Sequence, residues 1–202
     1  MFYEPQTRDK TLLPHDPFKA LIAPRPIGWV STLSKSGAIN LAPYSFFNAV
    51  CDQPPIIVFS STGAKDSMTF AGETGEFVWN MPTYALREHM NATSALLPRG
   101  ECEFEFADLE MAPSRLVKPP RVAASPASLE CKVTDLYQLK DMHGAPTPNY
   151  LVFGQVIGVH IDEAFIKDGI VDTAAMQPIT RCGYMDYAVT EKMFTMQRPQ
   201  KP

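Results

Sequence analysis

The sequence lacks the motifs that mark several large enzyme classes. It contains no GxGxxG dinucleotide loop, no GxxxxGK[ST] phosphate loop, no GxSxG nucleophile elbow and no HExxH zinc motif. Its histidines are scattered singly, with no partner placed beside any of them: His15, His89, His143 and His160. We therefore expect neither a catalytic side chain nor a metal site.

Paired cysteines, long apolar runs and a charge of one sign are also missing. The four cysteines lie far apart without a CxxC pair, as expected for free thiols in a reducing cytosol. The most apolar run, residues 150–161, is too short and too polar to span a bilayer. The formal net charge is only −4, with no basic stripe, which argues against a nucleic-acid partner. These features predict a cytoplasmic protein that binds neither membrane nor nucleic acid.

What the 202 residues do contain is a series of short runs rich in β-branched and aromatic residues, separated by Gly, Ser, Asn or Pro. We expect strands over 28–33, 38–42, 55–61, 76–81, 128–139 and 149–161. Residues 34–38 read as a hairpin turn in which Gly37 takes a positive φ. Glu103 and Glu105 alternate along a polar run, which indicates a solvated strand face.

Helical signals are fewer. We expect helices over 66–75, with Asp66 or Ser67 as the N-cap, and over 83–97, with shorter ones near 172–178 and 187–195. The proline-rich stretch 111–128 has no period and indicates an extended surface crossing. Many strands and few helices predict a single mainly β domain over 1–202, an antiparallel barrel with peripheral helices.

Two segments carry groups that suit an anionic ligand. In SSTGAKDSMTF (60–70) a strand ends at Ser60, and a helix begins near Lys65 and Ser67. A helix N-terminus beside a lysine favours a phosphate, although an ordinary cap with an exposed lysine explains the same residues. In PRPIGWVSTLSKSG (24–37) two prolines hold Arg25 at a strand entrance, where it either pairs with an anion or lies in water.

The stretch NLAPYSFFNAV (40–50) breaks the alternation that a half-buried strand should show. Its aromatic residues fall on both faces, with Ser45 and Asn48 among them. A core strand with satisfied polar groups and a wall for a flat ligand both explain this pattern.

Taken together, the motifs resemble the flavin reductase-like family of FMN-binding split barrels. The resemblance rests on these stretches in the family's order: PRPIGWVST (24–32), NLAPYSFFNAV (40–50), Lys65-Asp66-Ser67, FVWNM (77–81), MNATSALLP (90–98), SRLVKPPRV (114–122) and RCGYMDYA (181–188). It implies a split antiparallel β-barrel that forms a homodimer and holds one FMN per subunit, with FAD as the alternative flavin. The chain has Ser67 where the family usually has Thr, and Gly183-Tyr184 where it often has a glycine pair.

The resemblance also implies the residues of the flavin site. Ser31 and Thr32 are expected to line the flavin, and Ser45, Phe46 and Asn48 to contact its ring or ribityl chain. Ser60, Lys65 and Ser67 are expected to hold its phosphate. Ala92, Thr93 and Ser94 are further expected contacts. Tyr44 and Phe47, on the opposite face, belong to the core or the dimer contact.

Four functions follow from these expectations. The first is an oxidoreductase that passes reducing equivalents from NADH or NADPH to a flavin or another acceptor, including an acceptor protein. The second is a flavin-containing electron carrier, reduced by a partner protein. The third is a barrel that binds another planar ligand, such as heme or a pyridoxal-type phosphate, and the fourth is a structural barrel. Arg115, Lys118 and Arg121 either meet a nicotinamide nucleotide's phosphates or are solvated charges, and Trp29 and Trp79 are expected in the core or an interface.

Overall fold

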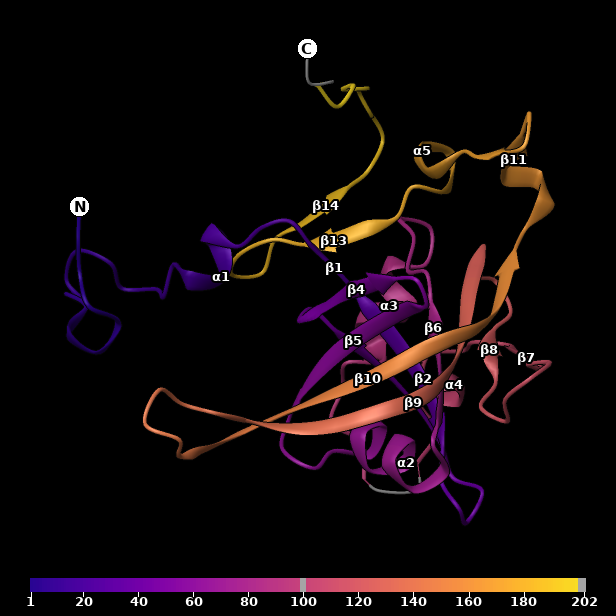
Figure 1. Cartoon of the computed structure of the whole chain (residues 1–202), viewed down its shortest axis with the longest axis horizontal. Coiled ribbons are helices and arrows are strands. Elements are labelled where there is room, and N and C mark those ends of the chain that lie inside the picture. Colours follow the sequence, from indigo (N-terminus) through magenta and orange to yellow (C-terminus); the bar gives the residue numbers. More distant parts are fainter. Residues whose placement is uncertain (99–100, 200–202) are drawn as a thin grey trace.

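A seven-stranded antiparallel sheet dominates the computed structural model, which describes residues 1–98 and 101–199 (Figure 1). Its strand order is β3-β2-β6-β9-β10-β5-β4. The bounds are β2 Gly28–Leu33, β3 Ile39–Tyr44, β4 Phe47–Asp52, β5 Pro55–Thr62, β6 Glu76–Asn80, β9 Ala127–Lys140 and β10 Pro146–Ile161. The two edge strands, β3 and β4, are consecutive in the chain, so the sheet curls round and brings β3 close to β5. The predicted mainly β, antiparallel barrel is confirmed.

Three small sheets and several short helices surround this barrel. One sheet joins β1 Arg25–Pro26, β13 Ile179–Arg181 and β14 Tyr187–Val189. The two others pair β7 Met111–Ala112 with β8 Arg121–Val122, and β11 Ile166–Lys167 with β12 Ile170–Val171. The helices are η1 Pro5–Thr7, α1 Phe18–Leu21, α2 Asp66–Thr74, α3 Arg87–Ala92, α4 Glu103–Phe106, η2 Glu163–Phe165 and α5 Thr173–Met176. In the described part of the chain none of them is long and apolar enough to cross a membrane.

The strand β2 separates two apolar clusters because its side chains alternate between its faces. Trp29, fully buried, packs with the cluster beneath α3 and α4, and its Nε1 donates to Thr93 Oγ1 at 2.9 Å. Val30 packs with the barrel interior, where the ring of Trp79 lies parallel to that of Phe47 at 5.8 Å. Both tryptophans therefore lie in the core, as predicted.

The glycine of the GWVST motif has a packing role. A side-chain carbon on Gly28 would lie 2.7 Å from the ring of Phe47, so only glycine lets that ring reach Trp79. A second close approach lies between the terminal segments, where a Cβ on Gly183 would stand 2.3 Å from the Cβ of Ala20. The next residue, Tyr184, has a φ of 54°, which is the left-handed region that favours glycine. Tyr184 thus has a backbone conformation that glycine adopts without strain.

The predicted strands match the observed ones within a few residues, and Gly37 has the expected positive φ of 92°. The helix expected over 187–195 is wrong, because residues 187–189 form β14 and pair with β13. The helix expected over 83–97 shortens to α3, because Thr83 forms a bridge with Pro178. In both places a tertiary contact overrides the local helical pattern.

Three further expectations are corrected. Residues 40–50 form two strands that meet at Ser45–Phe46, and the observed corner explains why the alternation breaks. Within 111–128, β7 and β8 pair with each other. Glu103 and Glu105 lie on α4, and Glu103 is buried, with its Oε2 accepting a hydrogen bond from the Leu41 N–H at 3.0 Å.

Candidate functional site

The corner between β3 and β4 is held in place by Arg25, which is only 8% exposed. Its Nε donates to the Ser45 carbonyl at 3.2 Å, and its Nη2 to the Cys182 carbonyl at 2.8 Å. Its Nη1 donates to the carbonyls of Ile22, at 2.7 Å, and Lys19. Among the described residues the guanidinium pairs with no acid, and it is buried rather than in water. It ties the N-terminal segment and the β13–β14 turn to the corner.

The corner presents an aromatic ring to the outside. Phe46 is 41% exposed, and the cationic groups of Arg25 and Lys19 lie 5.7 and 6.0 Å from the centre of its ring. The neighbouring aromatic residues turn inward instead: Phe47 stacks on Trp79, and Tyr44 packs on Phe59 at 4.9 Å. Phe46 is thus the aromatic residue of this corner left to face a ligand.

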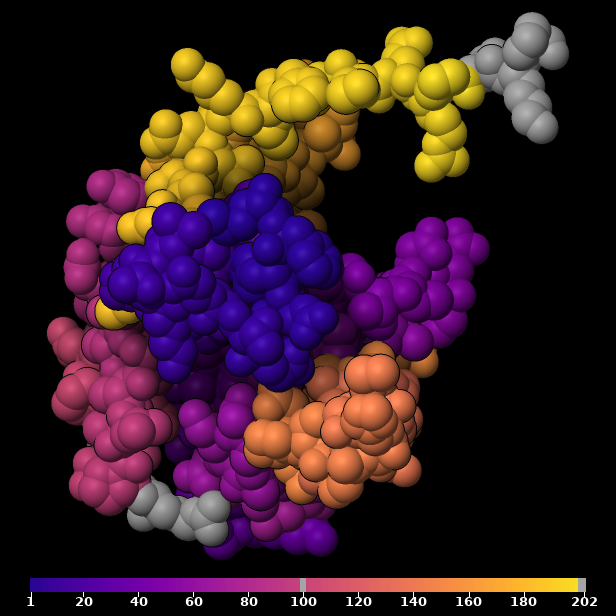
Figure 2. Space-filling model, turned by 90° about the vertical axis from the view of Figure 1, so that its left-hand side faces the viewer, coloured from indigo at the N-terminus to yellow at the C-terminus, as the bar shows by residue number. Residues whose placement is uncertain are grey.

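A hollow of about 620 Å³ lies outside this corner, and we call it the Phe46 hollow. The hollow is lined by the start of β4, the middle of β5, the end of β9 and the first part of β10, together with β1 and the segment before it. Its lining residues are Leu21–Pro26, Ser45–Asn48, Val58, Ser60, Leu139, Asn149 and Leu151. Figure 2 shows this side of the molecule, with the indigo N-terminal segment between the yellow C-terminal segment and the orange β9–β10 hairpin.

A second hollow, of about 290 Å³, lies on the other side of the corner at the start of α2, and we call it the α2 hollow. Its lining residues are Asn40, Ala42–Tyr44, Lys65, Asp66, Thr93–Leu97 and Glu103. Lys65 is the N-cap residue of α2 but makes no side-chain capping bond, so first-turn N–H groups of the helix lack that partner. The exposed Lys65 side chain adds a positive charge at the same end of the helix dipole.

Buried polar groups line the floor of the α2 hollow. The side chains of Asn40 and Ser67 are hydrogen-bonded, with Nδ2 and Oγ 2.7 Å apart. Burial raises the pKa of Tyr44, against the opposing effect of hydrogen bonds with Ser67 and Ser61. Burial also raises the pKa of Glu103, and the charge of Asp66 adds to this shift. The hollow thus combines cationic and N–H donors at its mouth with a carboxyl group that resists ionisation at its floor.

The structure divides the predicted flavin residues into three sets. The α2 hollow contains Lys65, Thr93 and Ser94, with Ser67 in the polar layer behind it. The Phe46 hollow contains Ser45, Phe46, Asn48 and Ser60. Ser31, Thr32 and Ala92 line neither hollow.

The residues outside the hollows have other environments. Ser31 and Thr32 are fully buried; Ser31 Oγ donates to the Pro120 carbonyl at 2.5 Å, whereas Thr32 Oγ1 has no hydrogen-bond partner in the described structure. Ala92 is half-buried at the end of α3. Thr93, although it lines the α2 hollow, already uses its hydroxyl for Trp29 and the Met90 carbonyl.

Three polar residues of the α2 hollow were not predicted from the sequence as site residues. Asn40 and Tyr44 flank the apolar part of β3, and an asparagine inside such a strand is a usable signal for a polar site. Glu103 gave no usable signal, because its burial depends on α4 packing against β3. Across residues 1–98 and 101–199 no group of three His, Cys, Asp or Glu side chains could hold a metal ion.

The chain matches one family model and is similar in sequence and fold to several known proteins. The family model described as "Flavin reductase like domain" matches residues 21–174. Protein BH2278 of Halalkalibacterium halodurans is 34% identical over 88% of this chain and 87% of its own length. Nitrilotriacetate monooxygenase component B from Bacillus cereus superposes with a TM-score of 0.87 at 29% identity, covering 97% of this chain and 98% of that one. A Shewanella frigidimarina protein with a flavin-reductase split barrel domain gives a TM-score of 0.81 at 20% identity, covering 90% of each chain.

Proposed function

Because this chain belongs to the flavin reductase-like domain family and has its split-barrel fold, we propose that it is an FMN-binding oxidoreductase. In this proposal it takes reducing equivalents from NADH or NADPH and passes them to a flavin or a downstream acceptor. The resemblance read from the motifs is confirmed at the level of family and fold. The electron donor, the acceptor and the individual site residues belong to the proposal.

The observation that carries the proposal is the pair of hollows on either side of the β3–β4 corner. The α2 hollow offers a lysine and uncapped helix N–H groups, a donor set that suits a phosphate. The Phe46 hollow offers an exposed aromatic face beside Ser45 and Asn48, which suits a flat polar ring. The residues present therefore fit a flavin mononucleotide, whose phosphate and ring need these two environments.

We assign the roles by hollow. Lys65 binds the phosphate by a charge-assisted contact, supported by Ser94 at the mouth and Ser67 behind it. Ser45, Phe46 and Asn48 orient the ring and the ribityl chain, and Ser60 contributes from β5. FMN, when bound, supplies hydride acceptance at its own ring, so the chain needs to bind and orient the reactants rather than move a proton.

One observation favours the flavin-containing electron carrier as a second candidate. The sequence offered three basic residues as contacts for a nicotinamide nucleotide's phosphates, and these line neither the Phe46 hollow nor the α2 hollow: Arg115, Lys118 and Arg121. A carrier reduced by a partner protein needs no such contact in its own chain.

We further propose that the chain works as a homodimer. Large apolar side chains are exposed around the Phe46 hollow, among them Phe18 at 53%, Leu21 at 77% and Val50 at 52%. A second copy of the chain that covers them also shields a flavin ring in the hollow from water.

Flavin titration tests the proposal. The purified chain is expected to take up FMN with a visible absorption band, and Lys65→Ala to weaken binding about tenfold through loss of one screened phosphate contact. Lys35→Ala, which removes an exposed lysine outside both hollows, is the matched control. A chain that takes up no FMN contradicts the function, and equal effects of the two variants contradict the phosphate assignment. Anaerobic mixing with NADH and NADPH then separates the two candidates, because the carrier is not bleached by either nucleotide.

A further inference from the structure

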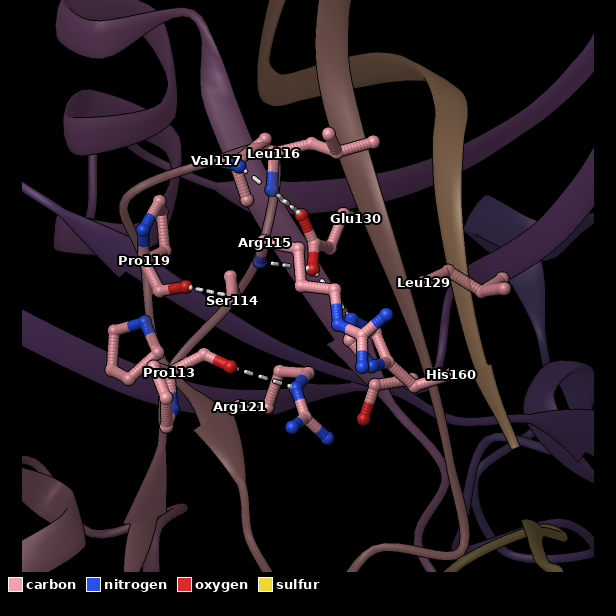
Figure 3. Close-up of polar contacts among 12 residues, drawn as sticks. Pro113, Ser114, Arg115, Leu116, Val117, Pro119, Arg121, Leu129, Glu130 and His160 are labelled. Atoms are coloured by element: carbon pink, nitrogen blue, oxygen red, sulfur yellow. Dashed lines mark hydrogen bonds and ion pairs between the residues drawn. The ribbon is translucent and has the colours of Figure 1, made fainter. Parts of the chain in front are cut away.

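The proline-rich segment is fastened to the barrel by a carboxylate. Glu130, on β9, has no exposed side-chain surface. Its Oε1 accepts from the Arg115 N–H at 2.7 Å, and its Oε2 from the N–H groups of Leu116, at 2.6 Å, and Val117, at 3.1 Å (Figure 3). One buried carboxylate thereby fixes three consecutive residues of the segment.

The same carboxylate orients a side chain on the neighbouring strand. His160 Nε2, on β10, lies 2.5 Å from Glu130 Oε1, and the imidazole is 17% exposed. Burial pushes the pKa of Glu130 up, but the bonds from the Arg115 N–H, His160 and the next two N–H groups outweigh it, so that its pKa lies below the usual value. Glu130 is therefore stabilised in its anionic form, and it holds the backbone of Arg115 and the ring of His160 in position.

Arg115, Arg121 and His160 meet around an open hollow of about 540 Å³. Figure 3 shows both guanidinium groups near His160. Arg121 Nε donates to the Pro113 carbonyl at 3.3 Å. In the part of the chain that the structure describes, the terminal nitrogens of Arg115 and Arg121 have neither a hydrogen bond nor an ion pair. Two forked donors thus face a polar hollow with their outer N–H groups unused.

Two carboxylates line the same hollow as the arginines. Asp162 and Glu163 follow β10 directly, and Asp162 uses one oxygen to accept the Ala164 N–H at 3.0 Å. A bare polyanion suits the arginines but is repelled by the carboxylates. A ligand with a phosphate at one end and hydroxyl donors at the other suits both, because arginine forks match phosphate oxygens and carboxylates accept hydroxyl groups.

We propose that this hollow binds the sugar-phosphate portion of a phosphorylated ligand. Arg115 and Arg121 bind the phosphate, and the ring of His160 lines the hollow beside them. Asp162 and Glu163 accept hydrogen bonds from the sugar hydroxyls. Glu130 acts as a positioning residue behind them.

This site is distinct from the proposed flavin site in the same chain. The Phe46 hollow includes Leu151 of β10, and the new hollow begins at Val159 of that strand. Eight residues at about 3.3 Å each separate the two sites by roughly 25 Å. The third basic residue of the segment, Lys118, lines another hollow altogether. The proposal therefore does not depend on flavin binding.

Calorimetric titration of the full chain with ribose 5-phosphate, ribose and inorganic phosphate tests the assignment. We expect ribose 5-phosphate to bind more tightly than the other two, and Arg115→Ala and Arg121→Ala each to weaken it about tenfold. Lys118→Ala, from the same segment, is the matched control and should change the affinity less than about twofold. Both arginine side chains reach solvent, so the variants should keep the parent melting temperature.

Four outcomes overturn the proposal. The first is that ribose 5-phosphate fails to bind at millimolar concentrations. The second is that inorganic phosphate binds as tightly as ribose 5-phosphate, which would leave Asp162 and Glu163 without a role. Lys118→Ala weakens binding as much as the arginine variants, which shows a general charge effect. Alternatively, Lys65→Ala abolishes binding, which moves the ligand to the α2 hollow. Because Lys65 lies in the other site, failure of this proposal and failure of the flavin proposal give different results.

Discussion

Replacing Arg25 by alanine is expected to cost the protein about 3 kcal/mol of its free energy of unfolding. The guanidinium donates to four backbone carbonyls from three segments, those of Lys19, Ile22, Ser45 and Cys182, and is 8% exposed. A hydrogen bond to a charged group contributes about 1.5–3 kcal/mol, and the four bonds share one cation, so their sum is well below four separate contributions.

Urea denaturation followed by circular dichroism measures this loss, and a thermal melt should fall by about 6–12 °C for a chain of this size. Arg25→Lys should recover little, because one ammonium group does not reach all three segments. Lys35→Ala is the control: its side chain is exposed, and its loss should change stability by less than about 0.5 kcal/mol. A loss below about 1 kcal/mol for Arg25→Ala would refute the view that this residue holds the corner.

Four other substitutions, at Thr32, Ser31, Tyr184 and Glu76, test particular features of the fold. Thr32→Val should raise the free energy of unfolding, measured in urea, by about 1 kcal/mol, because it removes a buried hydroxyl that has no partner in the described structure. Ser31→Ala should lower the free energy of unfolding, because the Ser31 hydroxyl donates to the Pro120 carbonyl. A loss of FMN affinity in Thr32→Val would instead support a flavin contact. Tyr184→Gly should stabilise the chain by about 1 kcal/mol in the same assay by relieving a φ of 54°, and a loss would contradict the strain. Burial raises the pKa of Glu76, but Lys132, 2.5 Å away, and the Lys118 N–H lower it below its ordinary value. The carboxylate of Glu76 therefore stabilises the fold fully above the ordinary pKa of a glutamate. This stabilisation is lost as the pH falls through the lowered pKa. In urea titrations from pH 7 to pH 3, the difference between the parent and Glu76→Gln should therefore shrink, and a constant difference would contradict the ion pair.

The sequence was most informative where a pattern depends on neighbouring residues in the chain. The strand β2 was predicted with its observed bounds, since GWVSTL is an apolar run bounded by turn signals. Gly37 likewise predicted a turn with a positive φ, and its φ is 92°. The segment 187–195 misled because pairing of β14 with β13 decides its structure, and no local signal records that pairing.

The residues of the candidate site likewise differ in how well they could be predicted from neighbouring residues. Lys65 could be placed near the start of a helix from the residues around it, but the expected N-cap, Asp66 or Ser67, is wrong. The N-cap is Lys65 itself, and the helix begins at Asp66. The role of Arg25 could not be foreseen, because its carbonyl partners come from segments as far away as Cys182. The interior position of Thr32 depends likewise on the curl of the whole sheet rather than on its own strand.

The seam between β3 and β4 has a consequence for how the barrel moves. The two edge strands are joined by the chain itself and have no ladder of hydrogen bonds between them, so we expect the barrel to open here at a lower free energy than between its paired strands. A ligand that reaches from Lys65 to Phe46 bridges that seam. Its binding should slow amide hydrogen exchange along β3 and β4 more than along β9 and β10, whose long ladder is already closed. The ligand would then complete the wall of the barrel as well as occupy it.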